Sequence, residues 1–152
     1  MTESLPAKAR LAEAMKAALK AGDKPRLGAL RLIHAEIQRA EVDARKNLDE
    51  PGLVALLERM VKQRREAAEQ YRRGGREELA AREEAEIAVI REFLPEPLSE
   101  AEVTALVEEA LAACGARTAR DLGAVMQYLK PRLQGRADLG EVSRRVRARL
   151  QG

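Results

Sequence analysis

The stretch FLPEPLSEAE, residues 93–102, decides how this chain folds. Each of its prolines lacks an N–H donor and pushes the preceding residue towards extended geometry, so no helix continues through it. Ser99 and Glu102 then stand at the spacing of a capping box, in which a hydroxyl and a carboxylate bond the free N–H groups of a new helix. One helical half therefore ends here and another begins, which predicts two domains, residues 1–94 and 95–152.

The composition indicates a globular chain with an aliphatic core. Of 152 residues, 45% are hydrophobic, which is enough to build a core, yet only one Phe, two Tyr and no Trp are present. Charged residues make up 35% of the chain, and abundant Ala, Leu, Arg and Glu favour helix. Strand-like alternation of Val, Ile and Thr is absent from the sequence, so the expected class is all-α.

Start and stop signals divide the chain into helices. Expected helix starts carry a side-chain oxygen that can bond free N–H groups, and they are Ser4, Asp23, Ser99, Thr118 and Asp138. Expected stops are glycines or prolines, and they are Gly22, the segment 49–52, Gly74-Gly75, Gly115 and Pro131. The pattern predicts an N-terminal helical hairpin or bundle of about four helices, followed by a small three-helix C-terminal domain.

The sequence predicts a cytoplasmic protein without a membrane partner. A single cysteine, Cys114, excludes an internal disulfide and a multi-thiolate metal site, and fits a reducing compartment. No apolar run approaches the roughly 20 residues that a membrane helix needs. The first residues also lack the apolar region of a signal peptide, and their acidic side chains are untypical of a transit peptide.

A set of short motifs follows a recognisable order. The motifs are Leu30-Arg31, Lys62-Gln63-Arg64-Arg65, Tyr71-x-x-Gly74-Gly75-Arg76, Glu86-Ile87 to Phe93-Leu94-Pro95, Gly123-x-Val125-Met126 and Gly135-Arg136-Ala137-Asp138. In this order they resemble the GatB/YqeY family, and the resemblance to stand-alone YqeY-type proteins covers nearly the whole chain. From about Ser99 onward the chain also resembles the tail domain of the B subunit of the tRNA-dependent amidotransferase.

The resemblance implies an all-α protein whose larger relative contacts tRNA while other domains convert a mischarged aminoacyl group to its amide. The tail domain itself is not catalytic. This chain has no segment resembling the kinase-like or glutamine-hydrolysing parts, and 152 residues leave no room for them. A complete amidotransferase is therefore excluded, and we expect no activity of the protein's own and no cofactor.

Basic residues gather in the last third of a chain whose net charge is only +3. Arginine outnumbers lysine, which suits bidentate contact with phosphate. The residues expected to contact phosphate are Lys130, Arg132, Arg136, Arg144 and Arg145, and the same cluster continues to Arg147 and Arg149. A secondary basic patch comprises Lys62, Arg64, Arg65 and Arg73. The alternative is a solvated face with ion pairs four residues apart, such as Glu69 with Arg73.

The turn Gly135-Arg136-Ala137-Asp138 allows two interpretations. A glycine beside a helix N-terminus lets a phosphate approach free N–H groups, and Arg136 would stand next to it. However, Asp138 at the N-cap would occupy some of those donors and add negative charge, which describes an ordinary capped turn.

Catalytic and metal-binding patterns are scarce. His34 is the only histidine, and its place beside Ile33 and Ile37 suggests the boundary of an amphipathic helix rather than a base. Cys114 falls at a helix C-terminus, where the helix dipole disfavours a thiolate. The carboxylates Glu83, Glu84 and Glu86 are typical of the solvent-exposed side of a helix, so we expect no metal site.

These observations leave three candidate functions. The favoured one is a non-catalytic module that binds tRNA by its shape and backbone, with no duplex DNA expected as a partner. The second is a helical adaptor that docks a protein, such as an aminoacyl-tRNA or amidotransferase component. The third, which follows from the resemblance alone, is an accessory role in carbon–nitrogen ligation with glutamine as amide donor.

Overall fold

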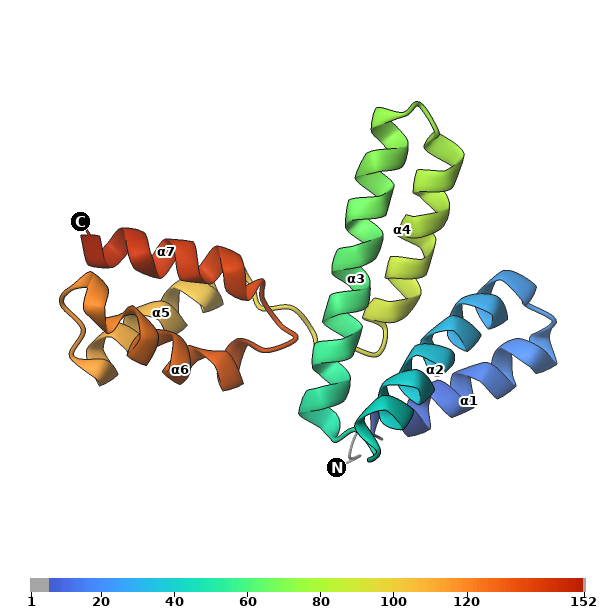
Figure 1. Ribbon diagram of the computed structural model, residues 1–152, viewed down its shortest axis with the longest axis horizontal. Coiled ribbons are helices and arrows are strands. Elements are labelled where there is room, and N and C mark those ends of the chain that lie inside the picture. The colour runs from blue at the N-terminus through green and yellow to red at the C-terminus, as the bar shows by residue number, and fades with distance from the viewer. Residues whose placement is uncertain (1–5, 152) are drawn as a thin grey trace. The chain divides into compact units, whose positions relative to one another are not determined.

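The computed structural model describes residues 6–151, and its contacts divide the chain into two units, Met1–Pro95 and Glu96–Gly152 (Figure 1). The first unit contains helices α1 (Ala7–Ala21), α2 (Lys24–Ala44), α3 (Glu50–Arg73) and α4 (Glu77–Arg91). The second contains α5 (Glu100–Cys114), the short 3-10 helix η1 (Ala119–Asp121), α6 (Leu122–Leu133) and α7 (Leu139–Gln151). Residues 6–151 include no strand, so the prediction of an all-α fold is confirmed.

Most of the predicted caps are found in the structure. The Asp23 carboxylate accepts a hydrogen bond of 3.2 Å from the Arg26 N–H. Ser99 and Glu102 form the reciprocal capping box, with bonds of 3.1 Å and 3.0 Å. The expected start at Ser4 lies outside the described residues, and α1 follows Pro6 directly.

Two of the predicted boundaries differ from the structure by a few residues: α3 begins inside the segment 49–52, and α6 ends at Leu133, near the expected stop at Pro131. In the segment 49–52 the third helix already begins, with Asp49 as its cap and Pro51 in the first turn, where the N–H has no helical partner anyway. Similarly, α6 continues through Pro131 to Leu133. Leu133 is fully buried, so its packing holds the last turn in place.

The core of the first unit is built from all four of its helices. Its largest fully buried side chains are Leu30, Ile33, Leu53, Leu57, Met60 and Ile90, and Phe93 adds one buried aromatic ring. This cluster contains no residue between Val61 and Ile87. The remaining part of the α3–α4 hairpin, residues 62–86, is therefore called the arm, and its buried hydrophobic residues are Ala68 and Ala80.

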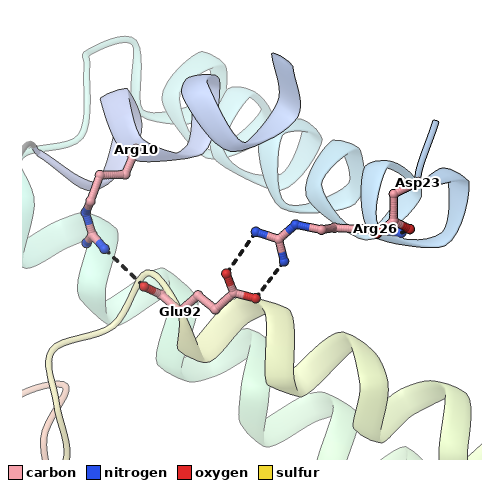
Figure 2. Close-up of polar contacts among 4 residues, drawn as sticks. All are labelled: Arg10, Asp23, Arg26 and Glu92. Atoms are coloured by element: carbon pink, nitrogen blue, oxygen red, sulfur yellow. Dashed lines mark hydrogen bonds and ion pairs between the residues drawn. The ribbon is translucent and has the colours of Figure 1, made fainter. Parts of the chain in front are cut away.

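A polar cluster ties α1 and α2 to the C-terminal end of α4 (Figure 2). Arg26 donates two hydrogen bonds to the Glu92 carboxylate, of 2.7 Å and 2.9 Å, and these raise the pKa of Arg26. Arg10 donates to the backbone carbonyl oxygens of Glu92, at 3.0 Å, and of Phe93, at 3.4 Å. The carbonyls at the end of α4, which lack helical partners, are thus satisfied by a charged donor.

The second unit packs three helices around a smaller core. Its buried residues are Val103, Val107, Ala110, Val125, Leu129, Leu133, Val142 and Val146. The segment that enters this unit is held by Arg136: the Leu98 N–H donates to the Arg136 carbonyl at 2.9 Å, and Arg136 Nε donates to the Glu96 carbonyl at 3.0 Å. None of the helices within residues 6–151 combines the length and apolar character needed to cross a membrane.

Candidate nucleic-acid interface

Helix α7 places its arginines on two different sides. Val142 and Val146 face the core, and Arg144 and Arg147 lie three residues apart on the exposed side. Within residues 6–151, neither of these two side chains forms a hydrogen bond or an ion pair. Their guanidinium groups are therefore open to an external anion.

Arg145 and Arg149 instead point to α5. Arg145 donates to Thr104 Oγ1 at 2.7 Å and to Glu100 at 3.3 Å. Arg149 forms a tighter pair with Glu108, in which Nη2 lies 2.7 Å from both carboxylate oxygens. These two arginines fasten α7 to α5 along one edge.

The basic residues of α6 also differ in their surroundings. Lys130 is exposed, and its ammonium group has no partner in the described part of the chain. The Arg132 guanidinium lies 3.8 Å from the centroid of the Tyr128 ring and donates to the Tyr128 carbonyl at 2.6 Å. The Tyr128 hydroxyl donates to Glu109 at 2.9 Å, and this bond to a carboxylate raises the pKa of Tyr128.

The turn before α7 has the geometry of a capped helix start. Gly135 has a φ of 79°, in the left-handed region that glycine favours. The Asp138 carboxylate accepts from the N–H groups of Gly140, at 2.9 Å, and Glu141, at 3.3 Å. Arg136 is directed to the Glu96 carbonyl. These contacts favour the capped turn over a phosphate site at this position.

Sequence reasoning missed two further candidates, Arg117 and Arg120. Both are exposed, and no hydrogen bond or ion pair of their side chains occurs among residues 6–151. They belong to the loop and 3-10 turn around η1, which packs against α7. Only the fold brings them near α7, because about 25 residues of sequence separate them from Arg144 and Arg147.

The secondary basic patch on the first unit also contains both exposed residues and residues held in ion pairs. Lys62 and Arg65 are exposed, and the positive charge of Arg65 adds to burial in lowering the pKa of Arg91. Arg64 lies between α3 and α4, where its Nε donates to Glu86 at 2.9 Å and only 16% of its side chain is exposed. Arg73 lies 3.7 Å from Glu69, which is the predicted pair four residues apart.

The residues considered for catalysis are dispersed. His34 is exposed on α2, rather than at the boundary of the core, and the half-buried Cys114 thiol donates to the Ala124 carbonyl at 3.7 Å. Glu84 and Glu86 bind Arg72 and Arg64, respectively. Burial, with the nearby Glu86 charge, raises the pKa of Glu83. In residues 6–151, no three His, Cys, Asp or Glu side chains gather into a group that could hold a metal ion.

The fold and this surface define an all-helical protein with two units and an arginine-rich face on its second unit. A family model described as "Yqey-like protein" matches residues 8–150, and the chain belongs to this family. The expected resemblance to stand-alone YqeY-type proteins is thereby confirmed.

Two curated relatives bear the same name, "Altered inheritance of mitochondria protein 41, mitochondrial". The protein from Pyrenophora tritici-repentis is 31% identical over 142 residues, which cover 90% of this chain and 77% of the relative. The protein from Lachancea thermotolerans is 36% identical over 106 residues, which cover 68% of this chain and 57% of the relative. These names place the relatives in mitochondria, and a cytoplasmic location of this chain stays a prediction.

Proposed function

We propose that this protein is a non-catalytic tRNA-binding module that contacts the RNA backbone through its second unit. The observation that carries the proposal is the exposed side of α7, where Arg144 and Arg147 have no partner within residues 6–151. Lys130, Arg117 and Arg120 add positive charge on neighbouring elements of the same unit. Guanidinium groups in this state bind phosphate in a planar, bidentate way.

The resemblance of residues 99–152 to the tail domain of the tRNA-dependent amidotransferase supports the choice of tRNA as the RNA. A tail-like unit without a catalytic group fits a role in holding the substrate of another enzyme. We therefore propose that the protein serves as a tRNA-binding component in amide transfer to tRNA. An adaptor for a protein partner and an accessory factor in carbon–nitrogen ligation are the alternatives that the test below separates.

The test compares tRNA binding by two double variants over a series of salt concentrations. In Arg144→Ala/Arg147→Ala, two phosphate contacts are lost, so the affinity should fall and the slope of log K against log salt should decrease by about one unit per contact. The matched control is Arg31→Ala/Arg59→Ala, which removes the same charge from exposed positions of the first unit. This control should change the slope little.

Competition with duplex DNA of similar charge tests the choice of RNA. A protein that reads the shape and backbone of tRNA should bind unrelated tRNAs about equally and the duplex DNA less well. Equal binding of tRNA and DNA, or equal effects of the two double variants, would contradict the proposal and leave the adaptor in its place. Lys62→Ala/Arg65→Ala then shows whether the arm shares the RNA surface.

A further inference from the structure

One side of α5 carries hydrogen-bond acceptors that face Arg145 and Arg149 on α7. Glu100, Thr104 and Glu108 are spaced by four residues, so they lie in a row along one side of the helix. The row faces Arg145 and Arg149, which are themselves four residues apart. Two carboxylates of α5 therefore neutralise two of the seven basic residues that the sequence gathers between positions 130 and 149.

The two ion pairs differ in geometry but both lie at the surface. Glu108 accepts three hydrogen bonds from Arg149, of 2.7 to 3.0 Å, and about half of each side chain is exposed. Glu100 is 86% exposed and lies 3.3 Å from Arg145, which is held more closely by Thr104. Exposed ion pairs of this kind are weak, so a charged ligand can compete with them.

We propose that Glu100 and Glu108 act as built-in counter-ions that withhold Arg145 and Arg149 from phosphate and so limit the affinity of the second unit for polyanions. Where the polyanion is tRNA, this inference rests on the proposed function. The phosphate-binding face then consists of Arg144, Arg147 and Lys130 with Arg117 and Arg120, while Arg145 and Arg149 contribute less because each is paired with α5. Because backbone contacts are independent of sequence, this restraint lowers binding to every nucleic acid alike.

The experiment replaces each carboxylate by its uncharged isostere. In Glu108→Gln the arginine is released, so tRNA affinity should rise by about two- to fivefold, the range that an exposed pair of this kind covers. The salt slope should steepen by about one unit, because one more phosphate is neutralised. Glu100→Gln should have the smaller effect, since Thr104 still holds Arg145.

The matched control is Glu109→Gln, on the same helix. Glu109 is the immediate neighbour of Glu108 in the sequence, but it accepts from the Tyr128 hydroxyl instead of from an arginine. Its replacement changes the net charge by the same amount and releases no arginine. A gain in Glu108→Gln no larger than the gain in Glu109→Gln would overturn the inference.

A double-mutant cycle shows whether the gain passes through Arg149. In an Arg149→Ala background, Glu108→Gln should have only the effect of the Glu109→Gln control, because no guanidinium remains to be released. An undiminished gain in this background would also overturn the inference. Circular dichroism of each variant checks that the helices are intact.

Elution from phosphocellulose separates this inference from the proposed function. This matrix offers phosphate without any RNA shape, so Glu108→Gln should elute at higher salt than Glu109→Gln whether or not tRNA is the natural ligand. If this shift is found while tRNA shows no advantage over duplex DNA, the counter-ion inference stands and the tRNA proposal fails. If the shift is missing, the inference fails, whatever the tRNA result.

Discussion

The two units use arginine in different ways. In the first unit Arg10 and Arg26 bond to Glu92 at the end of α4, and Arg64 bonds to Glu86 on α4, so they fasten the bundle together. In the second unit only one edge of α7 is fastened, and Arg144 and Arg147 face outward. A cluster of basic residues in a sequence is therefore not yet a basic surface. Helical position and the nearest carboxylate decide which charges remain open.

The cores of the units differ as well. The first contains Leu, Ile, Met and Phe side chains from four helices, whereas the second has eight buried residues, five of which are valine. A small core has few contacts to lose, so each large side chain carries a greater share of the stability.

The largest effect should come from emptying the smaller core. Leu129 is fully buried, and Leu129→Ala should lower the free energy of unfolding of the second unit by about 2–5 kcal/mol, because it removes apolar contact and leaves a cavity. Amide hydrogen exchange should accelerate in α5–α7 and stay unchanged in α1–α4. Leu57→Ala is the matched change in the first unit. Equal acceleration of both units by either variant would show that they unfold together.

An intermediate effect is expected inside the arm. Arg64→Ala leaves the half-buried Glu86 carboxylate without its donor, so we expect a loss of about 1–3 kcal/mol in a urea titration. Arg73→Ala removes an exposed pair 3.7 Å long and should cost less than about 0.5 kcal/mol. Similar losses for the two variants would mean that Arg64 is not fastening α3 to α4.

The smallest effect should appear as a pH dependence of the arm. A hydrogen bond from Arg72 lowers the pKa of Glu84. Because the folded pKa lies below the unfolded one, the pair stabilises the fold above the ordinary glutamate value of 4.5, and this contribution is lost as the pH falls further. In Arg72→Gln the melting temperature should therefore fall less steeply below that pH than in the parent protein.

The control for this pH dependence is Arg73→Gln, in which the Arg72–Glu84 contact is kept. It should leave the decrease of the melting temperature at low pH unchanged. If the melting temperature of Arg72→Gln falls at low pH as steeply as that of the parent protein, another carboxylate causes the dependence.

The sequence predicted features that depend on neighbouring residues. The cap at Asp23 and the capping box from Ser99 to Glu102 involve groups within one helical turn, so their spacing is visible in the sequence. The buried residues Leu30, Ile33 and Ile37 of α2 also follow the three- and four-residue spacing of one helix face, which is a local pattern.

The long-range contacts of the arginines could not be predicted, because they join distant segments, whereas the pair of Glu69 with Arg73 lies within one helix. Glu108 meets Arg149 across 41 residues, and Arg10 reaches the Glu92 carbonyl across 82. No local pattern marks either contact. Pro131 shows a second limit: the burial of Leu133 extends α6 past a residue that normally ends a helix.

The hydrogen bonds of Arg136 have a practical consequence for trimming the chain. Because Arg136 bonds to the Glu96 carbonyl and the Leu98 N–H, the entering segment is part of the second unit. A fragment that started at the capping serine, Ser99, would keep every helix of that unit and yet lose both bonds and the packed Leu98 side chain. An isolated second unit should therefore begin at Glu96, between Pro95 and Pro97, which is three residues before the capping serine Ser99.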